Sequence, residues 1–131
     1  MIRCVRLWTG GDGQSHFEEG CIDFPAGSRG DVVSAVAAAV SISFRESHKG
    51  GSFDWHDAPA RQLVLTLSGV LEFEMHGGQR FTLGAGDVLL AEDTTGGGHR
   101  WHTVGDIPWR RAYVILADGA TVPFVPVKGN S

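Results

Sequence analysis

The chain has few of the residues that mark a membrane span, an export signal or a nucleic-acid-binding surface. Only two cysteines and two lysines occur among its 131 residues, and the net charge is -4. That charge argues against nucleic acid as a partner, and the longest weakly polar run, Val32 to Phe44, is too short to cross a bilayer. The N-terminal segment has no apolar core of signal-peptide length. We therefore expect a cytoplasmic protein, with Cys4 and Cys21 as reduced thiols, that binds neither nucleic acid nor membrane.

Short apolar runs separated by glycine-rich turns dominate the sequence and predict an all-β protein. The hydrophobic fraction of 42% is sufficient for a packed core, and the 19 glycines lie between the runs. The length predicts a single domain over residues 1–131. Eight to ten strands at near-regular spacing indicate a sandwich or barrel. The pattern alone leaves a jelly roll, an immunoglobulin-like sandwich and a lipocalin-like barrel open, although the immunoglobulin Cys–Trp–Cys spacing is missing.

The expected strands are read from period-two alternation and from the turn residues between them. Residues 36–46 are ambiguous because their alanines favour helix, but the β-branched residues and their parity favour a strand. Residues 122–127 contain two prolines and can form only an edge strand or a draped tail. The full set of expected strands covers residues 2–8, 16–24, 36–46, 62–67, 70–76, 79–83, 87–91, 100–104, 109–116 and 122–127.

The segment from Phe53 to Gly69 carries the most informative alternation. Three leucines share one parity, and four other residues share the opposite parity: His56, Gln62, Val64 and Thr66. Because side chains alternate across a strand, His56 and Gln62 can face a cavity while the leucines face away. Three leucines at strand spacing would form an exposed apolar patch, so we expect Leu63, Leu65 and Leu67 to be covered by the N-terminal hairpin or a second subunit.

Residues 53–69 resemble the first motif of the cupin family, a His-x-His-x(3,4)-Glu-x6-Gly pattern. If the pattern ends at Gly69, His56 takes the first histidine position, Ala58 the second and Gln62 the glutamate position. Residues 86–103 resemble the second cupin motif, opening on Gly86-Asp87 and closing on a glycine-rich approach to His99. The resemblance implies an antiparallel β-barrel of double-sheet jelly-roll type, and it implies a homodimer because such barrels commonly pair through one sheet.

Most cupins bind a metal through three histidines and a glutamate, and this chain retains part of that set. Ala58 cannot be a ligand and Gln62 is neutral, which leaves His56, Gln62 and His99 as the predicted metal ligands. Imidazole nitrogens and an amide oxygen suit a divalent transition metal, and Zn, Fe, Ni and Mn remain open. Gln62 could equally satisfy a backbone group inside the barrel.

Other residues are candidates for the cavity wall and for proton transfer. Val64, Thr66, Trp101 and Tyr113 are predicted to line the pocket, and Glu46 and Asp54 are weak candidates for an acid or base because they precede the motif.

Two functions are consistent with these residues. In the first, the protein is a metal-dependent enzyme that acts on a small oxygen-bearing organic molecule by isomerase, lyase or dioxygenase chemistry. In the second, the altered motif has lost the metal and the barrel binds a small molecule without catalysis.

Overall fold

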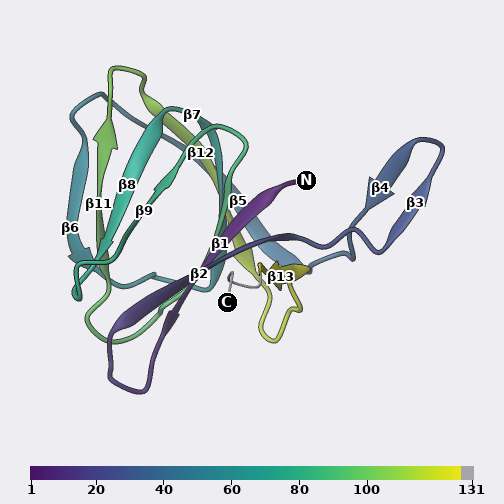
Figure 1. The fold of residues 1–131 in the computed structure, drawn as a ribbon, viewed down its shortest axis with the longest axis horizontal. Coiled ribbons are helices and arrows are strands. Elements are labelled where there is room, and N and C mark those ends of the chain that lie inside the picture. The colour runs from purple at the N-terminus through teal and green to yellow at the C-terminus, as the bar shows by residue number, and fades with distance from the viewer. Residues whose placement is uncertain (128–131) are drawn as a thin grey trace.

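The computed structural model describes residues 1–127, which form thirteen β-strands and no helix. Two large sheets face each other, and a short third sheet, a hairpin, projects away from them (Figure 1). The strands are β1 (Arg3–Thr9), β2 (Ser15–Ile22), β3 (Ala26–Ser28), β4 (Asp31–Val33), β5 (Ala39–Ser47), β6 (Ser52–His56), β7 (Gln62–Ser68), β8 (Val70–Met75), β9 (Arg80–Leu83), β10 (Val88–Glu92), β11 (His99–Val104), β12 (Trp109–Leu116) and β13 (Phe124–Pro126).

The larger sheet has the strand order β13-β2-β1-β10-β7-β12-β5, and the smaller one has the order β6-β11-β8-β9. All neighbouring strands are antiparallel except β1 and β10, which run parallel. The prediction of an all-β, double-sheet fold is therefore confirmed. The parallel pair is a local departure from the expected antiparallel arrangement.

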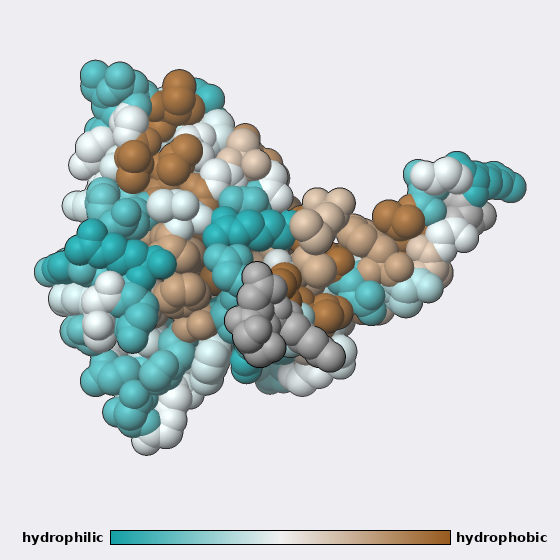
Figure 2. All heavy atoms as spheres, in the orientation of Figure 1, coloured by the Kyte–Doolittle hydropathy of each residue, from teal (hydrophilic) through white to brown (hydrophobic). Residues whose placement is uncertain are grey.

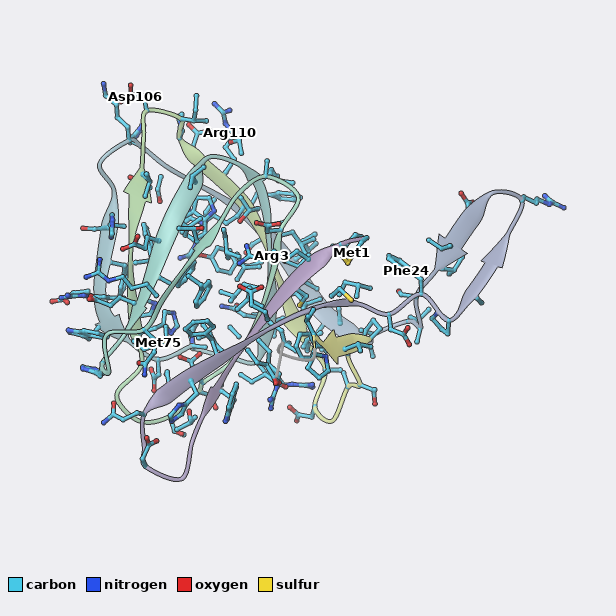
Figure 3. All side chains as sticks on the ribbon, viewed as in Figure 1. Met1, Arg3, Phe24, Met75, Asp106 and Arg110 are labelled. Carbon is cyan, nitrogen blue, oxygen red and sulfur yellow. The ribbon has the colours of Figure 1, made fainter. Side chains whose placement is uncertain are left out.

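Alternating side chains fill the space between the two sheets (Figure 3). In β8, Leu71, Phe73 and Met75 are buried while the residues between them are only partly buried. Strand β11 alternates in the same way along its whole length. Burying one face of each sheet against the other supplies the apolar core that this fold needs.

The projecting hairpin of β3 and β4 was not expected from the sequence, and neither was the short strand β6. Arg29 and Gly30 form the hairpin's turn, and both have positive φ values, of 56° and 84°. The sequence Arg-Gly-Asp at residues 29–31 lies at this turn and at the first residue of β4, and all three residues are exposed. Apolar side chains on this arm and on the segment after it are exposed, namely Val32, Val33 and Val36.

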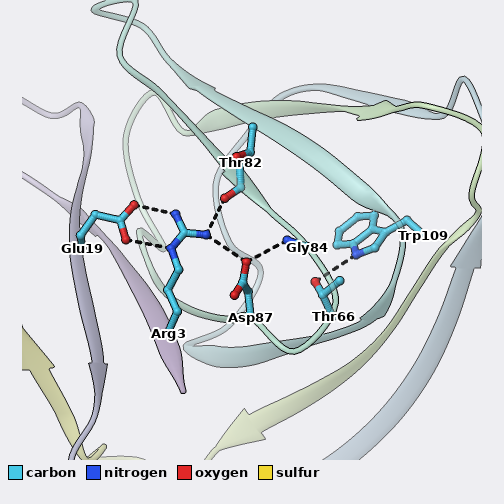
Figure 4. A network of polar contacts seen from close by, with 7 residues as sticks. All are labelled: Arg3, Glu19, Thr66, Thr82, Gly84, Asp87 and Trp109. Carbon is cyan, nitrogen blue, oxygen red and sulfur yellow. Dashed lines mark hydrogen bonds and ion pairs between the residues drawn. The ribbon is translucent and has the colours of Figure 1, made fainter. Parts of the chain in front are cut away.

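A polar network joins β1 to the turn that precedes β10 (Figure 4). The Arg3 guanidinium donates to both carboxylate oxygens of Glu19, to the carbonyl oxygen of Thr82 at 2.6 Å and to Asp87 Oδ2 at 3.0 Å. The same Asp87 oxygen accepts the backbone N–H of Gly84 at 2.9 Å. The Gly-Asp pair of the second motif thus has a structural role, because Asp87 closes the turn and holds it against β1.

The leucine face of β7 is covered only in part. Leu63 and Leu65 are half-buried and pack with Leu90 and Leu116, together with Val122 and Phe124 from the C-terminal segment. Leu67 is 56% exposed in the single chain, so the N-terminal hairpin does not cover it, and its cover by a second subunit stays a prediction. The exposure of Leu67 has a local cause: the pairing of β7 with β12 passes from Ser68 to Thr66, which leaves Leu67 without a partner in register.

Both cysteines are free thiols, and Cys4 is fully buried. Burial raises the pKa of the Cys4 thiol to about 12. No helix long and apolar enough to cross a membrane occurs in residues 1–127.

Candidate functional site

A cavity lies between the two sheets and has a narrow inner part and a wider outer part. The inner part, with a volume of about 40 Å³, is lined by His56, Gln62 and His99 together with apolar residues of both sheets. The outer part has a volume of about 340 Å³ and shares five residues with the inner one: His56, Pro59, Gln62, Trp101 and Tyr113. The inner volume is enough for a water molecule or an ion, and the outer volume is enough for a small organic molecule.

His56 and His99 come from neighbouring strands and stand directly opposite each other. His56 ends β6, His99 begins β11, and the two residues are partners in the antiparallel register. Their ring centroids are 4.6 Å apart. Gly98 permits this approach: its φ is +72°, and a Cβ at this position would collide with the carbonyl group of His56.

Each histidine is held through its Nδ1 atom. The Nδ1–H of His56 donates to the carbonyl oxygen of Asp54 at 2.7 Å, and His99 Nδ1 lies 2.6 Å from Asp93 Oδ2. Partners that accept at Nδ1 leave Nε2 of a neutral imidazole with its lone pair. Burial lowers the pKa of His56 from its ordinary value, and the nearby His99 lowers it further, whereas the bond to Asp54 acts in the opposite direction.

Asp93 is the buried anchor of the His99 ring, and the sequence did not reveal it. Its side chain is fully buried, and its Oδ2 atom also accepts the hydroxyl of Ser15 at 2.6 Å. The other oxygen, Oδ1, is buried and has no hydrogen-bond partner among the described residues. Asp93 lies six residues before His99 in a glycine-rich loop, where no periodicity indicates which side chains point inward.

Gln62 adds an amide oxygen to the inner cavity beside the two histidines. It begins β7 in the opposite sheet, is 7% exposed and lines both parts of the cavity. Within residues 1–127, no group of three or more His, Cys, Asp or Glu side chains is arranged to hold a metal ion. The three predicted ligands are thus two imidazoles and a neutral amide, and these groups suit a divalent transition metal.

The structure brings three of the four predicted wall residues to the cavity. Val64 lines the inner part, and Trp101 and Tyr113 line both parts. Thr66 is buried outside the lining, where its hydroxyl accepts the indole N–H of Trp109 at 3.2 Å (Figure 4).

Neither weak acid/base candidate reaches the cavity. Glu46 is ion-paired with Arg110 at 2.7 Å and lines a separate surface groove; this pair lowers the pKa of the Glu46 carboxyl. The Asp54 side chain lines a groove that includes Glu72 and Arg100, and only its backbone carbonyl serves the site, through His56. The carboxyl group that does line the outer cavity is Asp57, which directly follows His56.

Two arginines, Arg45 and Arg111, also line the outer cavity, and the sequence did not predict either. Arg111 follows Arg110 directly in the sequence. Alternation makes one of such a pair face inward, but it does not indicate which one.

Comparisons with known proteins give similarities in structure alone. No family model and no curated protein matches the chain. Among solved structures, the chain is similar to a conserved protein of unknown function from Streptococcus pyogenes, with 17% identity over 67% of this chain and 72% of that one, at a TM-score of 0.47. It is similar to a cupin 2 conserved barrel domain protein from Leptotrichia buccalis, with 19% identity over 70% of this chain and 44% of that one, at a TM-score of 0.48.

A third similar structure is an uncharacterized conserved protein with a double-stranded β-helix domain from Klebsiella pneumoniae. It shares 21% identity over 81% of this chain and 92% of that one, at a TM-score of 0.49. Similarity at this level does not assign a function. What the structure itself establishes is the fold, a small double-sheet β-barrel with a cavity between its sheets.

Proposed function

We propose that this protein is a metal-dependent cupin-type enzyme that acts on a small oxygen-bearing organic molecule. The observation that supports this proposal is the meeting of His56, Gln62 and His99 in one buried cavity, with each histidine fixed through Nδ1. Metal-binding histidines commonly have this arrangement, in which a carbonyl or carboxyl oxygen fixes the ring and leaves Nε2 free.

The proposed ligands are His56 and His99 through Nε2 and Gln62 through its amide oxygen. When bound, a divalent metal such as Zn, Fe, Ni or Mn would supply Lewis acidity toward a substrate oxygen. Isomerase, lyase and dioxygenase chemistry are all compatible with this role.

Other residues around the cavity are proposed to form its wall and to transfer a proton. Trp101 and Tyr113 wall the cavity and exclude bulk water from its inner part. Asp57 is placed to accept or return a proton at the substrate, because it lines the outer cavity beside His56.

Metal titration of the chelator-treated protein tests this proposal. Calorimetry with Zn²⁺, Mn²⁺, Fe²⁺ and Ni²⁺ should detect one site per chain for at least one of these metals, and the site should be lost in His56→Ala. Absence of binding for all four metals would favour the alternative, a barrel that binds a small molecule without a metal. That alternative is supported by the alanine at position 58 and by the neutral amide of Gln62.

We further propose that the protein is a homodimer that forms through the outer face of β5. This strand is at the edge of the seven-stranded sheet, and its outward apolar side chains are exposed, with Phe44 at 69%. The exposed apolar outer face comprises Val40, Ile42, Phe44 and Leu67. On the face seen in Figure 2, further hydrophobic residues gather where the projecting hairpin joins the barrel. A second copy would cover this apolar face and the free edge of β5 together.

A further inference from the structure

Arg111 is a buried cation without a carboxylate partner in the described residues. It is 4% exposed, and none of the ion pairs in residues 1–127 includes it. Its hydrogen bonds go to neutral groups: Nη1 donates to Ser47 Oγ at 2.8 Å and to the carbonyl oxygen of Trp109 at 3.1 Å, and Nε donates to Tyr113 Oη at 3.2 Å. Burying a charge without an opposite charge beside it costs free energy. Binding of a ligand that carries a negative charge would therefore be favoured.

The Arg111 guanidinium has one end, Nη2, without a hydrogen-bond partner among residues 1–127. Unlike Asp93 Oδ1, this atom is not completely buried. Arg111 lines the outer cavity and also the surface groove that contains Glu46, and we assign Nη2 to the outer cavity because the aromatic rings that the guanidinium contacts belong to Trp101, Trp109 and Tyr113. The guanidinium carbon lies 3.7 Å from the ring centroid of Trp109, and this stacking holds the charged group in one orientation.

A second arginine faces the same space from the neighbouring strand. Arg45 is the cross-strand partner of Arg111, lines the outer cavity and lies 5.0 Å above the ring of Tyr113. The carboxyl group that lines this part of the cavity is Asp57. Two arginines against one carboxylate give the cavity wall an excess of one positive charge.

We propose that the cavity takes a small organic carboxylate, bound by Nη2 of Arg111 and by Arg45, with the rest of the ligand extending toward His56 and Gln62. A carboxylate carries the single negative charge that balances the cavity wall, whereas a phosphate group carries about 1.5 to 2. Charge-assisted bonds from arginine to a carboxylate are among the stronger hydrogen bonds in proteins. The aromatic walls, Phe53 and Trp101, suit a flat apolar body behind the carboxylate. This inference rests on the proposed function only in taking the same cavity as the substrate site.

The test measures anion binding in chelator-treated protein, so that a metal cannot supply the attraction. Benzoate is the probe, benzamide is a neutral probe of the same shape, and inorganic phosphate is the competing anion. Calorimetry should show that benzoate binds at least tenfold more tightly than benzamide and more tightly than phosphate. Equal binding of benzoate and benzamide would overturn the inference.

Variants then assign the attraction to a residue. Arg111→Gln should weaken benzoate binding about ten- to a hundredfold. The matched control is Arg110→Gln, which should leave binding unchanged. Arg110 is adjacent in sequence but is paired with Glu46, and it lies at the same end of the barrel as Asp106 (Figure 3). Circular dichroism checks folding. Should Arg111→Gln fail to fold, Arg45→Gln decides the matter, because Arg45 is exposed and its loss should weaken binding several-fold.

The outcomes separate this inference from the proposed function. Binding of benzoate through Arg111 supports the inference whether or not the protein binds a metal, and failure of the same protein to take up any of the four metals on titration would contradict the metal-dependent function alone. Binding of benzoate only after metal loading, and equally in Arg111→Gln, supports the metal and overturns the role of the arginines.

Discussion

Replacement of Asp93 by asparagine should weaken metal binding without touching any proposed metal ligand. The Asp93 side chain accepts at Nδ1 of His99, which leaves the lone pair of Nε2 available to the cavity. An asparagine amide can instead donate to Nδ1, and the proton of a neutral His99 then moves to Nε2, where it blocks coordination. Loss of such a supporting partner typically costs ten- to a hundredfold in metal affinity, or about 1.4–2.7 kcal/mol.

Ser15→Ala provides the matched control for Asp93→Asn. It removes the other hydrogen bond to Asp93 Oδ2 but leaves the bond between Asp93 and His99 in place. This variant should lose about 1 kcal/mol of stability in urea denaturation and bind metal as the wild type does.

Competition titration against a chelator measures metal affinity in the wild type and in both variants. If Asp93→Asn bound metal as tightly as the wild type, the proposed role of Asp93 in fixing the His99 tautomer would be refuted. Equal weakening in Asp93→Asn and Ser15→Ala would mean that the network acts only through stability.

Three further predictions concern the cavity and the outer face. Gln62→Glu should tighten metal binding about ten- to a hundredfold in a chelator competition, because a carboxylate neutralises one of the metal's charges. Gln62→Leu should abolish metal binding. Unchanged affinity in both variants would show that Gln62 is not a metal ligand. Phe44→Glu should convert a dimer into a monomer of 14.0 kDa by light scattering, and a wild type that is already monomeric would contradict the proposed interface. In metal-free protein, the lowered pKa of His56 means that the unfolded chain binds the proton more readily. The stability that neutral His56 contributes to the folded chain is therefore fully present above about pH 6.5, and it is lost as the pH falls through the folded-state pKa of His56. Thermal melts should show the wild type losing stability toward acid faster than His56→Gln, and parallel pH profiles would contradict this.

The sequence predicted the strands whose alternation is strong. The predicted strand at residues 109–116 matches β12, and the alternation in residues 70–76 placed the buried face of β8 correctly. The projecting hairpin was missed because β3 and β4 have three residues each and bury no alternating face. Short strands of this kind depend on a turn conformation, here at Arg29 and Gly30, that residue type indicates only weakly.

The candidate site, like the fold, was predicted only in part. Strand parity and the cupin resemblance selected His56, Gln62 and His99, and the structure places all three around one cavity; that they bind a metal stays a prediction. Asp93 and Arg111 could not be found in this way, because each depends on a contact between distant segments. Asp93 meets Ser15 across 78 positions of sequence, and Arg111 meets Ser47 across 64.

Elemental analysis of untagged protein, compared with His99→Ala, tests the central claim most directly. The wild type should retain a transition metal near one equivalent per chain, and His99→Ala should retain none while staying folded, because one imidazole and a neutral amide are too few to hold the ion. His102→Ala, which removes an exposed histidine of the same strand, should keep its metal. A metal content in His99→Ala equal to that of the wild type would contradict the proposed site.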